Sequence, residues 1–255
     1  MFAVVFEVHP RDGQVDEYLV LAGMLRPQLE RIESFLSVER FTSRGRPSWM
    51  LSLSFWRDEA AVARWRAHAL HHEVQERARS EVFRDYRLRV GRVVADERQG
   101  RAQPGPGLRR AHDDSMARPP TFVAILEVGP VGDISGQRPD FAALHEAATE
   151  RIDGFLGGDW FDSIYVEGKQ VQLTAWRDQA AALAWHDRAL AIVAAPLAMG
   201  TSTDIAPAGG SGAAFHLQVT EVARDYGMFD RAEAPQYHAP IAHVEEEEAG
   251  AAPRE

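Results

Sequence analysis

Aromatic and histidine side chains between residues 65 and 75 offer the clearest chemistry in this chain of 255 residues. Trp65, His68, His71 and Gln75 follow one another at spacings of three or four residues, which place side chains on one face of a helix. A histidine with a pKa near neutrality suits general-base work on a phenol or an activated C–H bond. The run is therefore a candidate site for proton transfer, and solvated helix histidines are the alternative.

A metal site is the second interpretation of the same run. His68 and His72 are four residues apart, which is the spacing of helical zinc pairs. No third ligand is visible nearby, and a related stretch later in the chain has Arg188 and Ile192 at the matching positions. We therefore predict no metal site.

Further candidates flank this run on both sides. Trp56 recurs as Trp176 and is best interpreted as a core aromatic, although it also stands where a substrate could contact it. Arg79 can offer a positive charge to a phenolate or a reduced oxygen species, and Tyr86 is as compatible with the core as with a site. We assign Trp56, Gln75, Arg79 and Tyr86 to substrate binding. Glu7, which recurs as Glu127, is predicted to be a structural hydrogen-bond partner.

The elements that position these residues occur twice, because the chain repeats itself after 120 residues. The matching blocks are 2–10 with 122–130, 31–36 with 151–156, and 53–61 with 173–181. A constant offset means that the connections between the blocks have equal lengths in both copies. A period this long indicates a duplicated domain and not a solenoid repeat.

Each copy is predicted to run strand, helix, strand, strand, helix, strand. In the first copy we expect strands at 2–8, 35–42, 48–56 and 86–94, a helix at 16–33, and a helix capped by Asp58 that breaks near Ala69 and ends near Ser80. This order is that of the ferredoxin-like α+β fold. The open face of each sheet needs a partner, so we predict that the two repeats pack sheet to sheet as an intramolecular dimeric α/β barrel.

The predicted domains follow from these repeats and from composition. Residues 1–95 form the first domain, 96–120 a flexible linker rich in Gly, Pro and Arg, and 121–227 a second, diverged domain. Residues 228–255 form an arm that ends in a disordered acidic tail with four consecutive glutamates.

Several stretches of the first copy resemble a known protein family. The stretches 55–60 and 65–71, with Gln75 and 86–90 after them, look like antibiotic biosynthesis monooxygenases, which pair as dimeric α/β barrels. The resemblance implies oxidation of polycyclic phenols or anthrones by dioxygen without metal, flavin or nicotinamide. It places Trp65 at a cavity between helices and sheet and marks His71 as the base. Haem-degrading relatives carry their axial histidine where this chain has Gln75 and Ala195, so the resemblance argues against haem degradation.

Composition excludes several other classes of protein. Cysteine is absent, which rules out disulfides, thiolate metal sites and a cysteine nucleophile. The net charge of −10 disfavours nucleic acid and anionic membranes as partners. No apolar run is long enough for a transmembrane helix, and the N-terminus lacks a secretory signal, so a cytoplasmic location is predicted by default.

The sequence thus predicts a cofactor-free monooxygenase that oxidises a planar phenolic or anthrone-type aromatic with dioxygen. A polyketide cyclase or isomerase and a non-catalytic barrel that binds a small molecule or haem are the alternatives. The active site is expected in the first copy, and its rival is a pocket in the second copy lined by Trp160, Tyr165, Trp185 and His186. The sequence leaves open whether two chains pair as a homodimer.

Overall fold

The computed structural model describes residues 1–98, 101–103, 121–129, 141–149, 152–198 and 215–235. The first copy contains β1 (Phe2–Pro10), α1 (Val15–Leu29), β2 (Phe35–Ser43), β3 (Met50–Trp56), α2 (Glu59–Arg66), α3 (Ala69–Arg77), the π-helical turn η1 (Ala78–Val82) and β4 (Phe83–Arg98). The predicted element order is confirmed. Helix α1 ends earlier than predicted because the chain turns where Ile32 donates its N–H to the carbonyl of Leu29.

The second copy repeats this order with one helix where the first has two. It contains β6 (Phe122–Val128), α4 (Phe141–Thr149), β7 (Phe155–Ser163), β8 (Gln170–Trp176), α5 (Gln179–Ala198) and β9 (Phe215–Gly227). Strand β4 runs to Arg98, and β5 (Arg101–Gln103) pairs with its end. The first part of the expected linker is therefore sheet, whereas 104–120 lie outside the described residues.

The strands of the two copies close into one barrel. Their order is β1-β3-β2-β7-β8-β6-β9-β4, with β4 pairing back onto β1 and β5 added at the end of β4. The copies join at two seams, a long antiparallel pairing of β4 with β9 and a short one of β2 with β7. The predicted intramolecular α/β barrel of two ferredoxin-like repeats is confirmed.

Alternation along the strands separates the inside of the barrel from the outside. On β1, Ala3 and Val5 enter the apolar core inside the barrel, whereas Phe6 and Val8 pack toward the helices. Val123 and Ile125 occupy the inside positions on β6. Since successive strand residues point to opposite faces, each sheet buries one face against the other copy and one against its own helices.

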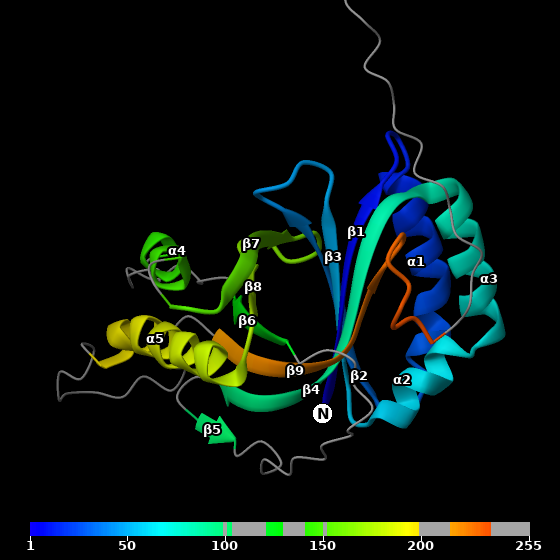
Figure 1. Ribbon diagram of the computed structural model, residues 1–255. Helices are drawn as coiled ribbons and strands as arrows, with labels where there is room; N and C mark the ends of the chain where they lie inside the picture. Colours follow the sequence, from blue (N-terminus) through cyan, green and yellow to red (C-terminus); the bar gives the residue numbers. More distant parts are fainter. Residues whose placement is uncertain (99–100, 104–120, 130–140, 150–151, 199–214, 236–255) are drawn as a thin grey trace, which may run out of the picture.

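Two helical layers cover opposite sides of the barrel (Figure 1). Helices α1, α2 and α3 lie over the sheet of the first copy, and α4 and α5 lie over that of the second. The second layer is closed by fully buried side chains such as Trp176, Trp185 and Leu144. The first layer is filled less completely and encloses a cavity.

The second helix of the first copy is broken as predicted. Asp58 caps α2 by accepting a hydrogen bond from the N–H of Ala61 at 2.7 Å. The helix ends at Arg66, and α3 begins after His68, whose backbone is extended at φ −65° and ψ 127°. His68 therefore stands at the start of α3 and does not share a regular helix face with His72.

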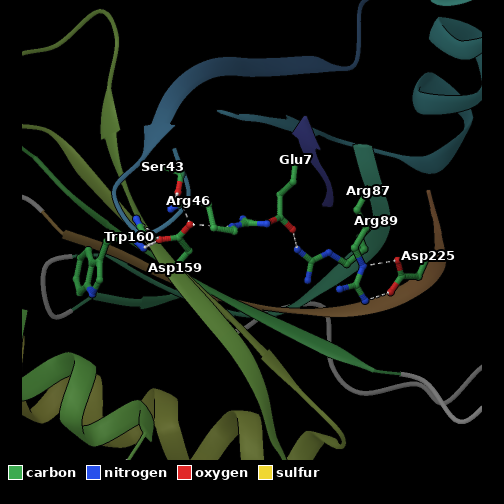
Figure 2. A network of polar contacts seen from close by, with 9 residues as sticks. Glu7, Ser43, Arg46, Arg87, Arg89, Asp159, Trp160 and Asp225 are labelled. Atoms are coloured by element: carbon green, nitrogen blue, oxygen red, sulfur yellow. Dashed lines mark hydrogen bonds and ion pairs between the residues drawn. The ribbon is translucent and has the colours of Figure 1, made fainter. Parts of the chain in front are cut away.

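Two of the ion-pair networks that join the copies are centred on Glu7 and Glu127. In the first, shown in Figure 2, Arg46 bridges Glu7 of its own copy and Asp159 of the other, and Arg89 also binds Glu7. In the second, Lys169 bridges Glu127 of its own copy and Glu39 of the other.

The two networks follow the internal repeat. Glu7 and Glu127 match at the 120-residue offset, and so do Glu39 and Asp159. Each bridging cation, Arg46 or Lys169, comes from the connection between the second and third strands of its copy. Glu7 and Glu127 are therefore structural partners, as predicted.

Candidate active site

A cavity of about 200 Å³ lies in the first copy between the sheet and its helices. Its floor is formed by β1, β2, β3 and β4, and its walls by α1, α2, α3 and η1. Apolar side chains such as Phe6, Leu21, Val74 and Phe83 supply most of the surface. Enclosed apolar space of this kind strengthens each polar interaction within it, because water is excluded.

His71 and Trp65 stand together in the wall of this cavity. Their rings are stacked with centroids 4.2 Å apart and planes 16° from parallel. The Nδ1 atom of His71 lies 2.9 Å from the carbonyl oxygen of Trp65, and its Nε2 atom lies 3.3 Å from the amide nitrogen of Gln75. At the break between α2 and α3, the same carbonyl also accepts the backbone N–H of His68 at 3.1 Å, so its two lone pairs serve His68 and His71.

These contacts fix the protonation state of the imidazole. A carbonyl can only accept a hydrogen bond, so Nδ1 carries the proton and donates it. Nε2 then keeps its lone pair and accepts the N–H of Gln75. Burial lowers the pKa of His71 to about 4, with smaller contributions from His68 and His72 and an opposing one from the Trp65 carbonyl. The ring is therefore neutral at neutral pH and has the lone pair that a base requires.

Arg79 enters the cavity from the π-helical turn η1. The residue is only 7% exposed, and its Nε and Nη2 atoms have no hydrogen-bond partner among the described residues. Burial lowers the pKa of its guanidinium, and the charge of Arg231 acts in the same direction. A π-helical turn widens the helix locally and is frequent at functional sites.

The second copy also contributes to this cavity, which sequence reasoning missed. Arg224 and Tyr226 come from the end of β9, and Arg231 and Pro235 from the segment that follows. Arg231 donates a hydrogen bond to the hydroxyl of Tyr86. Arg224 and Tyr226 are two residues apart on an extended segment and so face one side, which is the only local signal that the sequence held.

Tyr18 and Arg40 are further polar residues of the wall that the sequence did not single out. Arg40 is buried, and its guanidinium carbon lies 5.9 Å from the centre of the Tyr18 ring. Burial raises the pKa of the Tyr18 hydroxyl, although Arg40 opposes this shift. Tyr18 therefore stays protonated and can donate a hydrogen bond.

Trp56 lines the cavity as part of a repeated core arrangement. It is 1% exposed, and its indole N–H donates to the hydroxyl of Ser54 at 3.0 Å. Trp176 makes the same bond to Thr174 in the second copy, also at 3.0 Å. A contact that recurs in both copies fits the interpretation as a core residue, and a role of Trp56 in substrate binding stays a prediction.

The structure thus brings six of the seven predicted site residues into one cavity wall. These are Trp56, Trp65, His71, Gln75, Arg79 and Tyr86. His68 does not line the cavity, since its ring lies at 5.7 Å from that of Trp65 at the junction of α2 and α3. His68 is thus adjacent to the cavity through Trp65, and its role in proton transfer stays a prediction.

The rival residues of the second copy are dispersed. Trp185 is completely buried in the core beside Trp176, whereas Tyr165 is 54% exposed. Trp160 packs at the edge of that core, and His186 is buried with its Nδ1 atom 3.3 Å from Asp187. These four side chains do not share the wall of the cavity in the first copy.

The described part of the chain offers neither a metal centre nor a membrane span. Within it, no three side chains of the types His, Cys, Asp and Glu gather closely enough to hold a metal ion. None of the helices described there is both long and apolar enough to span a bilayer.

The sequence is similar to a known family and to a known protein. The family model for antibiotic biosynthesis monooxygenases matches residues 1–77, which include the α2–α3 junction. The jasmonate monooxygenase ABM of the fungus Pyricularia oryzae is 33% identical over 248 residues, which cover 95% of this chain and 100% of that protein. The similarity to this relative therefore extends through both copies.

Three solved structures that align with this chain cover different shares of it. A protein from Shewanella oneidensis is 16% identical and covers 35% of this chain and 86% of its own, with a TM-score of 0.33. An antibiotic biosynthesis monooxygenase is 17% identical and covers 35% and 95%, with a TM-score of 0.32. A protein from Lactobacillus acidophilus is 8% identical but covers 88% and 94%, with a TM-score of 0.36.

Proposed function

Since this chain belongs to the antibiotic biosynthesis monooxygenase family, we propose that it oxygenates a small organic molecule in the cavity of the first copy, without a cofactor. The observation that carries this proposal is His71. Its neutral imidazole is stacked on Trp65 in an apolar wall, with Nδ1 held by a carbonyl and the Nε2 lone pair available once Gln75 shifts. A fixed tautomer with a free lone pair is what a general base needs.

The proposed substrate is a planar phenolic or anthrone-type aromatic, and its partner is dioxygen. Nε2 of His71 takes a proton from the phenol or the activated CH₂ group, and the resulting anion gives one electron to dioxygen. The two radicals combine to a peroxide, which breaks its O–O bond as the second hydrogen leaves the same carbon. One oxygen atom stays as the new carbonyl and the other leaves as water with both hydrogens.

The substrate therefore supplies all four electrons that reduce dioxygen, which is why no external reductant enters this scheme. His71 holds the first proton and returns it to the departing oxygen. The apolar walls exclude water from the anion and the peroxide, so that neither is quenched by solvent. The buried imidazolium is costly by itself, but the substrate anion beside it provides the opposite charge.

The fungal relative suggests a second substrate class, because it is named a jasmonate monooxygenase. Jasmonate is a cyclopentanone that bears a carboxylate, and several arginines line the cavity. Hydroxylation of a saturated carbon would consume two electrons beyond those of the C–H bond. A jasmonate-like substrate would thus need a two-electron donor such as a reduced nicotinamide.

The test is oxygen uptake by chelator-treated protein with an anthrone, compared among the wild type, His71→Ala and His72→Ala. His72 is adjacent and does not line the cavity, so it controls for removal of a histidine. We expect His71→Ala to lower kcat by about 100-fold or more and His72→Ala to retain uptake, because a positioned base contributes about that factor. Parallel assays with jasmonate are run with and without a reduced nicotinamide.

Three results would contradict the proposal. Equal uptake by the wild type and His71→Ala would remove His71 from the chemistry. Turnover of a polyketide substrate at an undiminished rate without oxygen would instead identify a cyclase or isomerase. Binding of the aromatic without turnover under any condition would identify a non-catalytic barrel.

A further inference from the structure

The wall of the cavity carries positive charge and no negative charge. Six arginines line it, and no aspartate or glutamate of the described residues does. Most of these arginines already have partners. Arg26 pairs with Glu30 and Arg224 with Glu59, and Arg40 contacts Tyr18.

Arg79 differs from the other arginines of the wall. It is more than nine-tenths buried, and two of its nitrogen atoms, Nε and Nη2, have no hydrogen-bond partner among the described residues. Glu76 is the acid that raises the pKa of Arg79, but its effect is the smallest of those that act on this group, and Glu76 is exposed. A buried guanidinium without a counterion is costly, so a ligand that supplies the missing charge is favoured.

Tyr86 and Arg231 line the same cavity as Arg79, and the part of the wall that these three residues form is called the recess below. Tyr86 and Arg231 both act on the pKa of Arg79, and Arg231 donates a hydrogen bond to the Tyr86 hydroxyl. Two guanidinium groups with a phenol beside them match a carboxylate, since guanidinium binds both carboxylate oxygens through parallel hydrogen bonds.

The position of Arg79 along the helix relates this recess to the proposed base. His71, Gln75 and Arg79 follow one another at intervals of four residues and all line the cavity. At 1.5 Å per residue, the backbones of His71 and Arg79 are about 12 Å apart along the axis. The backbone of Arg79 therefore lies about two helical turns beyond that of the base.

We propose that Arg79, with Tyr86 and Arg231 beside it, is an anion subsite, and that the substrate bears a carboxylate remote from the carbon that is oxidised. The position of the oxidised carbon rests on the proposed function, whereas the anion subsite does not. In this arrangement Arg79 orients an elongated substrate and takes no part in the transfer of protons or electrons.

The test is binding under anaerobic conditions, measured by titration calorimetry. The probes are 6-hydroxy-2-naphthoate, which has its hydroxyl and carboxylate at opposite ends, and its methyl ester, which lacks the charge. Jasmonate and methyl jasmonate form a second pair. We expect the wild type to bind each acid about tenfold or more tightly than its ester, since charged hydrogen bonds are lost in the ester.

Three variants test whether Arg79 causes the preference for the acids over the esters. Arg79→Met should weaken binding of the acids about tenfold or more and leave the esters unchanged, and Arg79→Lys should restore part of the difference. Arg77→Met is the matched control, because Arg77 is exposed at the end of α3, two residues before Arg79, pairs with Glu17 and Glu81, and does not line the cavity. Thermal unfolding of each variant verifies that it is folded.

The subsite is refuted if the wild type shows no preference for either acid, or if Arg77→Met reduces the preference as much as Arg79→Met does. Equal loss of acid and ester in a folded Arg79→Met protein refutes it as well. Oxygen uptake is scored separately. If the protein prefers the acids through Arg79 but takes up no oxygen, the subsite stands and the oxygenase proposal fails. If it takes up oxygen but shows no preference for the acids, the oxygenase proposal stands and the subsite fails.

Discussion

The neighbours of His71 fix the orientation and the tautomer of its imidazole. Its ring is held by stacking on Trp65 and by hydrogen bonds at both nitrogens, so its orientation and tautomer are set before a substrate arrives. Burial lowers its pKa to about 4. The same burial makes the free ring a weak base, and the base becomes effective only beside the anion that it generates.

The lowered pKa predicts how stability depends on pH. The unfolded chain takes up a proton on this histidine near pH 6.5, whereas the folded protein does so only near pH 4. Stability is therefore unaffected by this group above about pH 6.5 and falls as the pH drops toward 4. The loss amounts to at most about 3 kcal/mol.

Urea unfolding of the wild type and His71→Leu between pH 4 and 7 measures this contribution. The wild type should lose up to about 3 kcal/mol more than the variant over that interval. Subtracting the variant removes the contributions of other titrating groups such as His9, whose pKa burial also lowers. Parallel curves for the two proteins would mean that the pKa of His71 is not depressed in solution.

At the scale of the elements, the broken helix over the first sheet organises the site. At the gap between α2 and α3, the Trp65 carbonyl accepts hydrogen bonds from both His68 and His71, and the turn η1 carries Arg79. The sequence predicted this break near Ala69, in a helix that Asp58 caps. It held no sign of the π-helical turn, because one extra residue in a turn leaves almost no trace in apolar spacing.

The seam between β4 and β9 depends on a glycine. The strands shift register between Val90 and Gly91, and a Cβ atom on Gly91 would lie 2.3 Å from the carbonyl oxygen of Glu221 and 2.6 Å from a methyl group of Thr220. Backbone cannot move away as a flexible side chain can. Only glycine therefore allows the two strands to approach this closely.

We predict that Gly91→Ala destabilises the protein by about 2–3 kcal/mol, as overpacking in a core does. Gly23→Ala is the control, because a Cβ atom on Gly23 in α1 would meet nothing within 4 Å, and alanine favours a helix by about 0.5–1 kcal/mol. Chemical denaturation gives both values. A fully stable Gly91→Ala protein would show that the seam has room to open.

At the scale of the whole molecule, the two copies are no longer equivalent. The core of the second is closed by Trp176 and Trp185, and the cavity of the first is completed by residues that β9 and the following segment bring across the seam. Strand β9 extends to Gly227, and its last residues include Arg224 and Tyr226. The second copy therefore both closes the barrel and supplies part of the first copy's site.

The ion-pair networks between the copies are expected to contribute to the free energy of unfolding. Arg46→Met leaves the buried Glu7 with fewer partners and also removes the link to Asp159, so we expect a loss of about 2 kcal/mol. Arg44→Met is the matched control in the same connection. Arg44 pairs with Asp162 of the other copy, but both side chains are about half exposed, so its loss should stay below about 1 kcal/mol.

Chemical denaturation of the two variants makes this comparison. Equal losses for Arg44→Met and Arg46→Met would contradict the assigned importance of the buried carboxylate. A larger loss for Arg46→Met at both low and high salt would support it, because salt screens buried pairs much less than exposed ones.

The sequence by itself determined the duplication and the order of the elements. Its spacing also grouped Trp65, His68, His71 and Gln75, and three of these four line the cavity, whereas His68 stands at the break between α2 and α3. These features are local, since they depend on residues that are near one another in the chain or on a repeat of the same local pattern.

Only the tertiary structure decided how the barrel closes and what else enters the site. Arg231 reaches Tyr86 across 145 positions of sequence, and Arg46 reaches Asp159 across 113. Periodicity states which face of a strand is buried but not which strand will pair with it or in which register. Those choices arise from the joint packing of both copies, and they set the partners of the site residues.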